Sequence, residues 1–315
     1  CHMRYRVQGR PDLKPGPNQY RTDFEAELCV NFIKENRERP FFLMLSPFAV
    51  HIPLGAMSDK VEKYRQKAAE QKRELPHPVY AAMIESLDEN IGRLLVALER
   101  SGKAEDTIVI YSTDNGPHMN SWPDAAMTPF RNEKNSNWEG AFRVPAMVRW
   151  PGKIPAGVVS NEIIAHQDWL PTFLAMAGEP EIKEKLKAGH QAGDKTFKVH
   201  IDGYNLLPYL SGEEEKGPRP GFIYFSDDGE LTAVRFDNWK LVFAEQRATG
   251  TLKIWQEPFT PLRVPYFFNL RTDPFERANI TSNSYYDWMI DHVYLLYAGQ
   301  AIVARFMDTF NEFPP

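Results

Sequence analysis

Hydrophobic and polar positions in the first third of the chain alternate between helical and strand-like patterns. Apolar residues recur at helical spacing after Asp23, which the pattern makes a helix N-cap, and again along residues 79–100. Continuous apolar runs at 41–46 (FFLMLS) and 107–112 (TIVIYS) have the composition of buried strands. We expect these runs to form parallel strands of one sheet, joined through the second helix by a right-handed crossover.

The middle of the chain continues this pattern with less regularity. A further strand is expected over 146–150, and a charged, solvated stretch over 60–74. Asp168 is expected to cap a helix that Gly178 closes, and 181–198 is a charged, glycine-containing insertion.

The pattern changes after about residue 221. Short alternating runs separated by turn residues predict an antiparallel meander, with strands over 222–225, 232–236, 240–243 and 266–269. An amphipathic helix over 285–310 is expected to cover one face of that sheet. The predicted fold class is α/β: a mostly parallel central sheet flanked by helices over 1–215, then a smaller antiparallel sheet with a helix over 216–315.

Composition narrows the class of function. With 315 residues and 43% hydrophobic content, the chain can bury a large core. The formal net charge of -5 gives no positive field for nucleic acid or an anionic membrane, and no apolar run approaches the roughly 18 residues of a membrane helix. The two cysteines, Cys1 and Cys29, are too few for a disulfide framework. Small-molecule chemistry is therefore the expected class.

Polar residues that directly follow predicted strands are the first candidates for chemistry, because active sites of parallel sheets lie beyond the carboxyl ends of the strands. Asp114, Asn115 and Gly116 follow the 107–112 run. A carboxylate and a carboxamide on one tight turn offer the hard oxygen ligands that calcium or magnesium prefers. The alternative is an ordinary turn, which Asp-Asn-Gly also favours.

Two further candidates lie in the neighbouring loops. His51 follows the 41–46 run and could donate a proton to a departing oxygen, although a loop histidine is more often simply solvated. Lys134 could supply a compact positive charge to a sulfate or phosphate oxygen, although most lysines are surface groups. Glu139 and Gly140 are expected to be structural, with the carboxylate accepting backbone N–H groups. Arg131 and Arg143 are expected to be packing or surface groups.

The order and spacing of these motifs resemble one family. The segments PFFLMLSPFAVHIPL, SLDENIGRLL, TIVIYSTDNG and WEGAFRVP, followed by FNLRTDPFERANITS, are similar to the sulfatase family of the alkaline-phosphatase-like superfamily, and to bacterial arylsulfatases in particular. The resemblance covers nearly the whole chain. It implies an alkaline-phosphatase-like fold and hydrolysis of a sulfate ester, and it favours a periplasmic or secreted protein.

The resemblance also implies roles for individual residues. Asp114 and Asn115 match the family's calcium ligands, and magnesium is a possible substitute. His51 matches the histidine that contacts the sulfate ester and protonates the leaving group. Lys134 matches the lysine that bonds a sulfate oxygen. His118 could reach the substrate, but packing behind the site is the expected role.

The chain departs from the family pattern in two places. Glu139-Gly140-Ala141 replaces the family's Glu-Gly-Gly, and we expect the turn to survive one added methyl group. Neither Cys1 nor Cys29 begins the Cys/Ser-x-Pro/Ala-x-Arg motif from which sulfatases make their formylglycine nucleophile. The chain therefore reads as the carboxy-terminal two thirds of a sulfatase. We expect the nucleophile from a preceding segment or a second chain, and no turnover by these residues alone.

Two other functions fit the same residues. One lysine and one histidine do not separate sulfur from phosphorus chemistry, so a phosphoesterase or phosphonate monoester hydrolase of the same superfamily is the nearest alternative. A non-catalytic protein that binds a sulfated glycan is the second. Whether the leaving group is aryl or sugar is left open by the sequence.

Overall fold

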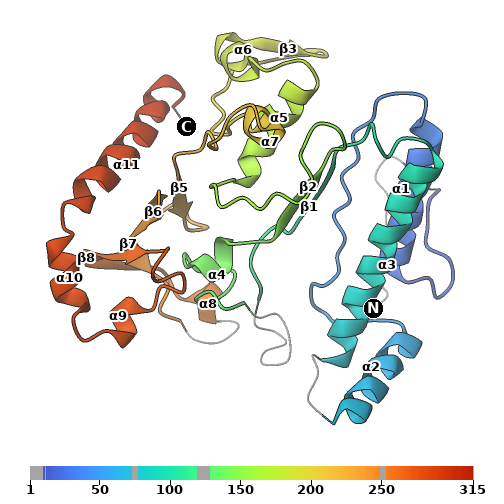
Figure 1. The fold of residues 1–315 in the computed structure, drawn as a ribbon, viewed down its shortest axis with the longest axis horizontal. Helices are drawn as coiled ribbons and strands as arrows, with labels where there is room; N and C mark the ends of the chain where they lie inside the picture. Colours follow the sequence, from blue (N-terminus) through green and yellow to red (C-terminus); the bar gives the residue numbers. More distant parts are fainter. Residues whose placement is uncertain (1–9, 11, 73–76, 119–127, 249–252, 315) are drawn as a thin grey trace. The chain divides into compact units, whose positions relative to one another are not determined.

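The computed structural model describes residues 10, 12–72, 77–118, 128–248 and 253–314 (Figure 1). The chain divides into two compact units, one made of Cys1–Val109 with His118–Met127 and the other of Ile110–Pro117 with Thr128–Pro315. Each unit has its own hydrophobic core. No helix in the described part of the chain combines the length and the apolarity that a membrane crossing requires.

The first unit is built on three helices, α1 (Arg21–Asn36), α2 (Ser58–Gln71) and α3 (Pro78–Arg100). The helix predicted over 79–100 is confirmed, with a proline in its first turn. The core of the first unit comprises Ile33 of α1 with Ala97 and Leu98 of α3.

The expected N-cap of the first helix is wrong. Tyr20 is the N-cap of α1, and Asp23 lies within its first turn. The Asp23 carboxylate accepts a hydrogen bond from Asn90 Nδ2 at 2.6 Å, so it joins α1 to α3 instead of capping the backbone.

The strand predicted at 41–46 is also wrong. These residues have no strand structure, and their side chains alternate. Phe41 and Leu43 pack against the helical core, whereas Phe42 and Met44 are 68% and 76% exposed. A continuous apolar run forms a buried strand only when both of its faces are covered, and only one is covered here. The expected parallel pairing with 107–112 is not found in the described residues.

The charged stretch at 60–74 overlaps α2, a helix without a buried residue. It lies along α3 through ion pairs, among them Lys63 with Glu85 at 2.9 Å and Lys60 with Glu89. The expected solvation of this stretch is therefore correct, and its helical structure was not predicted.

The second unit, which starts at Ile110, contains all but the first residue of a two-stranded sheet of β1 (Val109–Ser112) and β2 (Ala146–Arg149), which confirms the strands expected there. Between them lies the one-turn helix α4 (Glu139–Phe142). A 3-10 turn, His166–Asp168, leads into α5 (Trp169–Met176). The following elements are α6 (Ile182–Ala188), β3 (His190–Ala192), β4 (Lys195–Phe197) and α7 (Leu207–Ser211).

The carboxy-terminal meander is confirmed. Its strands are β5 (Gly221–Phe225), β6 (Leu231–Phe236), β7 (Trp239–Glu245) and β8 (Thr260–Asn269), all antiparallel and in sequence order. The helices of this part are α8 (Lys253–Gln256), α9 (Ala278–Thr281), α10 (Tyr285–Asp291) and α11 (Leu295–Glu312). The single helix predicted over 285–310 is thus two, with the break at His292, whose Nδ1 donates to the carbonyl of Trp288 at 2.7 Å.

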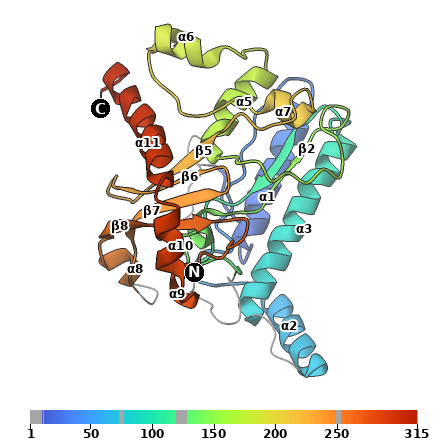
Figure 2. The ribbon, with the colours of Figure 1, turned by 60° about the vertical axis from the view of Figure 1, so that its left-hand side comes forward.

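Both faces of this sheet are covered. Figure 2 shows α10 and α11 along one face, where Leu241 and Phe267 of the sheet pack against Tyr285 and Leu295. On the other face Trp138, next to α4, packs in a buried cluster with residues of all four strands. The domain boundary expected near residue 215 falls inside the second unit and stays a prediction.

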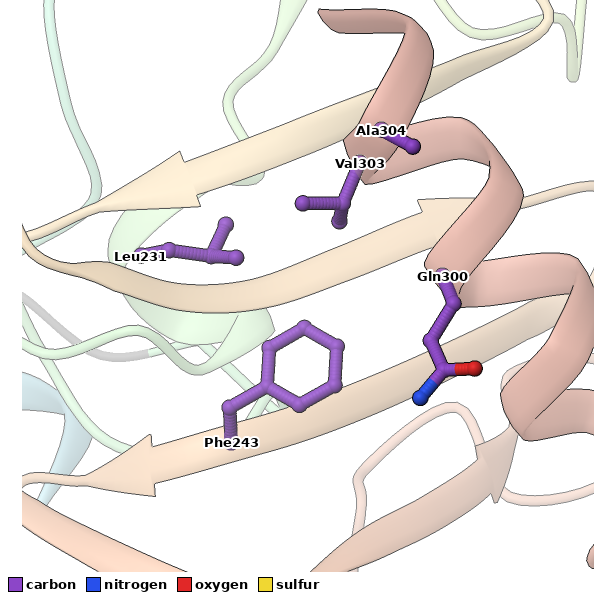
Figure 3. Close-up of a pocket in the computed structure, with 5 residues that line it drawn as sticks. All are labelled: Leu231, Phe243, Gln300, Val303 and Ala304. Atoms are coloured by element: carbon purple, nitrogen blue, oxygen red, sulfur yellow. The ribbon is translucent and has the colours of Figure 1, made fainter. Parts of the chain in front are cut away.

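A small pocket lies between the sheet and α11. It has a volume of about 290 Å³ and is lined by Leu231, Phe243, Gln300, Val303 and Ala304 (Figure 3). Its walls are apolar apart from the Gln300 amide, so it offers no group for acid–base or metal chemistry.

Candidate active site

The Asp114–Gly116 turn follows β1 directly. The Asn115 side-chain amide donates to the carbonyl of Gly116 at 2.8 Å, which leaves Oδ1 as the acceptor atom of that side chain. The Asp114 carboxylate is exposed and accepts a long hydrogen bond, 3.4 Å, from the Thr113 hydroxyl. The turn therefore presents one carboxylate and one amide oxygen from adjacent residues.

Backbone hydrogen bonds tie this turn to α4 and to the loop of Lys134. The Gly116 N–H donates to the carbonyl of Ala141 at 2.7 Å, and the Lys134 N–H donates to the carbonyl of Pro117 at 2.9 Å. The Gly140 N–H in turn donates to the carbonyl of Arg131 at 2.9 Å. Three separate segments between β1 and β2 thus form one backbone assembly. The turn at Glu139-Gly140-Ala141 is intact, as expected, because Ala141 lies in a helical turn that any residue can occupy.

The Lys134 side chain is half-buried, and its Nζ lies 5.6 Å from the centre of the Trp255 ring in α8. A cation over an aromatic face is attracted by the ring, so Trp255 helps to orient the ammonium group. No motif or spacing in the sequence links these two residues.

The metal-binding capacity of the described residues is partial. Calcium takes six to eight oxygen ligands, and Asp114 with Asn115 supplies oxygens of the correct chemical type. Within the described ranges, no group of three or more His, Cys, Asp or Glu residues could hold a metal ion. The donor set fits part of a calcium shell.

His51 lies in an exposed loop of the first unit. Its backbone N–H donates to the carbonyl of Phe48, and its ring Nδ1 lies 2.7 Å from the carbonyl of Ile52. A carbonyl can only accept, so Nδ1 carries the hydrogen and Nε2 is the nitrogen that can gain or release a proton.

The predicted site residues are divided between the two units. Asp114, Asn115 and Lys134 belong to the second unit, where the backbone assembly brings their loops together. His51 and the half-buried His118 belong to the first. The roles of all five residues stay predictions.

Glu139 is structural, as expected, but its partners differ from those predicted. Among the described residues, its carboxylate accepts from three side chains and from no backbone N–H group: Tyr224 Oη at 2.7 Å, Lys240 Nζ at 3.1 Å and Arg235 Nη1 at 3.2 Å. Its backbone N–H donates to Glu276 Oε2 at 2.7 Å.

Burial and charge act in opposite directions on these carboxyl groups. Burial raises the pKa of Glu139, but the attraction of Lys240 and Arg235 outweighs it, and the pKa lies below the ordinary value. For Glu276 burial dominates and the nearby Glu139 charge adds to it, so its pKa is raised despite Lys240.

Other charged residues serve packing. Arg131 lies 3.5 Å from the centre of the Trp138 ring, and Arg143 lies 4.5 Å from that of Phe130, in keeping with the expected packing roles. Asp168, expected only as a helix cap, is fully buried and forms a bidentate ion pair with Arg219, with oxygen–nitrogen distances of 2.8 and 2.5 Å.

One residue beside the Asp114 turn was not predicted. His166 Nε2 donates to the carbonyl of Thr113 at 3.0 Å, next to the candidate metal pair. A single histidine before a helix carries no sequence signal for such a contact.

Comparison with known proteins identifies the family. The sulfatase family model matches residues 3–179, more than half of the chain. Curated relatives include mouse steryl-sulfatase, 30% identical over 81% of this chain and 40% of its own length. Dog N-acetylgalactosamine-6-sulfatase is 29% identical over 90% of this chain and 53% of its own length. The chain thus spans about half the length of the curated relatives it matches.

Solved structures agree with the family model. The crystal structure of the PsFucS1 sulfatase from Pseudoalteromonas sp. superposes with a TM-score of 0.71 at 26% identity, covering 92% of this chain and 52% of that one. This likeness confirms the predicted fold class. On the family model and on this fold, the chain belongs to the sulfatase family.

Proposed function

We propose that the protein is a sulfuric ester hydrolase and that this chain contributes Asp114, Asn115, Lys134 and His51 to its active site. The observation that supports it most directly is the backbone assembly that joins the Asp114 turn, α4 and the Lys134 loop at the end of β1. Two oxygen ligands on one turn, joined through the backbone to the loop of a lysine, would suit a divalent cation and a tetrahedral anion.

The substrate class follows from the relatives. Steryl-sulfatase and N-acetylgalactosamine-6-sulfatase are named for a sterol and an amino sugar, which share the sulfate ester and differ in the leaving group. We therefore assign a sulfate ester of a small molecule or carbohydrate, with no assignment of the leaving group.

Each side chain has a distinct task in this proposal. Lys134 binds a non-bridging sulfate oxygen and offsets the negative charge that develops there. His51 donates a proton from Nε2 to the departing oxygen, while its Nδ1–H stays bound to the carbonyl of Ile52. His118 is assigned to packing behind the site, with direct substrate contact as the less favoured role.

Asp114 and Asn115 would hold Ca²⁺, or Mg²⁺, together with ligands from outside these residues. When bound, such an ion polarises the sulfate group and neutralises charge. The nucleophile in this proposal is a formylglycine from a preceding segment or a second chain, because neither cysteine in the sequence lies in the required motif.

The proposal is tested with the protein in its longest natural form, identified by intact mass spectrometry. We expect hydrolysis of 4-nitrophenyl sulfate in preference to 4-nitrophenyl phosphate. Asp114→Ala and Lys134→Ala should each lower kcat/KM by about 100-fold or more. The matched controls are Asp194→Ala and Lys195→Ala in the exposed β3–β4 hairpin, which should retain full activity.

Two results would contradict the proposal. A preference for the phosphate ester would establish the phosphoesterase alternative. Calorimetric binding of a sulfated sugar without release of sulfate would establish the glycan-binding alternative.

A further inference from the structure

A fully buried lysine lies on the face of the carboxy-terminal sheet that is turned toward α4. Lys240 of β7 has no exposed surface. Its Nζ lies 2.8 Å from the carbonyl oxygen of Asn137, 3.1 Å from Glu139 Oε1 and 2.7 Å from Glu276 Oε1. The first two oxygens accept hydrogen bonds from the ammonium group, and Glu276 Oε1 forms an ion pair with it.

Lys240 belongs to a set of interacting groups that we call the Glu139 cluster: Glu139, Glu276, Lys240, Arg235 and Tyr224. Burying charges costs more than burying apolar groups of the same volume, so stability alone does not account for such a cluster. The same face of the sheet is otherwise packed with apolar residues, including Val242 and Phe268. Charged and hydrogen-bonded groups contribute something that apolar packing does not: they fix the orientation and register of the segments that they join.

The groups held by the cluster lead directly to the candidate active site. Lys240 binds the carbonyl of Asn137 and the carboxylate of Glu139, and Glu276 binds the Glu139 N–H. These contacts fix the start of α4. The carbonyl of Ala141, two residues after Glu139, accepts the Gly116 N–H at 2.7 Å.

A second connection leads from the same helix to Lys134. The N–H of Gly140 donates to the carbonyl of Arg131, three residues before Lys134. Both predicted functional loops of the second unit therefore depend on the position of α4. That position is set by β5, β6 and β7, through Tyr224, Arg235 and Lys240.

We propose that Lys240 is a positioning residue: it anchors α4 to the carboxy-terminal sheet, and through α4 it sets the position of the Asp114–Asn115 metal pair and of Lys134. This inference rests on the proposed function for the role of those residues. The mechanical link from Lys240 to Gly116 is a property of the fold and can be measured separately.

The test compares Lys240→Met with Leu241→Ala in the protein in its longest natural form. Leu241 is the next residue on β7, equally buried, and packs on the opposite face against α10 and α11. Leu241→Ala deletes apolar packing from the same strand, whereas Lys240→Met nearly keeps the side-chain volume and removes the polar contacts to α4. Hydrogen exchange of the peptide containing Gly116 reports on the link, and calorimetric titration with calcium alone reports on the metal pair.

For Lys240→Met we expect exchange at Gly116 to rise and calcium affinity to fall about 10- to 100-fold, as for other residues that orient metal ligands. Leu241→Ala should leave the Gly116 exchange rate and the calcium affinity close to the wild-type values, when the proteins are compared at temperatures equally far below their melting temperatures. If the two variants change Gly116 exchange equally, or if Lys240→Met leaves it unchanged, Lys240 is not a positioning residue.

Tyr224→Phe provides a milder version in case Lys240→Met does not fold. It removes one hydrogen bond to Glu139 Oε1 and leaves every charge in place. Faster exchange at Gly116 without loss of the Leu241 core supports the proposal, and unchanged exchange overturns it. A wild-type protein that binds no calcium would contradict the proposed function, while the exchange comparison would still decide the role of Lys240.

Discussion

The α-carbon of Gly116 lies against the carbonyl oxygen of Gly140, so closely that an ideal Cβ on Gly116 would be 1.8 Å from that oxygen. Gly140 is enclosed in its turn: a Cβ there would be 2.3 Å from the carbonyl oxygens of both Arg131 and Asn132. These neighbours are backbone atoms, which cannot rotate aside as a side chain can. Glycine is therefore required at both positions, because the backbone segments approach too closely to leave room for a Cβ atom.

Gly116→Ala should therefore destabilise the protein by about 3 kcal/mol or more, because the added methyl group forces the DNG turn away from α4. The measurement is urea unfolding. Gly92→Ala is the matched control, since Gly92 lies within α3 and a Cβ there meets no atom within 4 Å. Alanine at that helical position should stabilise by about 0.5–1 kcal/mol. Equal effects of the two substitutions would contradict the packing described for Gly116.

Asp168→Asn should cost about 3–5 kcal/mol, because it leaves the Arg219 guanidinium buried without its counter-charge. The exposed pair of Glu179 and Lys185 provides the control. Glu179→Gln should cause no measurable change, since exposed ion pairs contribute little. Thermal unfolding of both variants checks the difference, and similar melting temperatures would exclude a stabilising role for the Asp168 ion pair.

Glu139→Gln should destabilise the protein in a pH-dependent manner. The pKa of Glu139 is lowered in the folded state, since Lys240 and Arg235 outweigh the effect of burial. A carboxyl group of this kind stabilises the fold above its unfolded pKa, and the contribution is lost as the pH falls through the folded value. The difference in unfolding free energy between the wild type and Glu139→Gln should therefore stay constant down to about pH 5 and shrink as the pH falls further, through and below the ordinary carboxyl range.

Glu276 opposes this trend, because its raised pKa gives a contribution that is present at low pH and lost as the pH rises through the folded value. The wild-type profile alone thus mixes two effects of opposite sign. The difference in unfolding free energy between the wild type and Glu139→Gln reports on the ionisation of Glu139 and on its interaction with Glu276. A difference that grows toward acid pH would show that burial outweighs Lys240 and Arg235 at Glu139.

His51→Ala should affect substrates with poor leaving groups most, if His51 protonates the departing oxygen. General acids of this kind contribute about 100- to 10,000-fold. Comparing kcat/KM for an alkyl or sugar sulfate with that for 4-nitrophenyl sulfate gives the dependence. Equal losses for both substrates would assign His51 to sulfate binding alone.

The sequence pattern predicted the elements that have a clear apolar stripe or clear boundaries. Helix α3 lies where expected because its buried positions repeat at helical spacing, and the four strands of the meander do so because turn residues separate short apolar runs. The 41–46 run shows the limit of this signal. Six apolar or small residues in a row do not reveal whether one face or two will be covered. Helix α2 was missed for the opposite reason, since it buries no residue and so has no apolar stripe.

The candidate site was predictable only in its local part. The Asp114 turn could be located because it directly follows a strand, and Lys134 because of its spacing from the neighbouring motif. The Glu139 cluster joins residues as far apart as Glu139 and Glu276, and isolated charged residues ordinarily indicate surface. One signal was present: Val242, two residues after Lys240 and therefore on the same face of the predicted strand, is apolar, which indicates that this face can also be covered.

The covering of the carboxy-terminal sheet by α4 on one side limits how far this protein can be trimmed. A shortened chain that ends at residue 215 would keep Asp114, Asn115 and Lys134, but Glu139 would lose Tyr224, Arg235, Lys240 and Glu276 together. The smallest piece that keeps these contacts therefore extends at least through Glu276. Grafting or directed evolution of the candidate site should treat the meander as part of its structural support and not as an appendage.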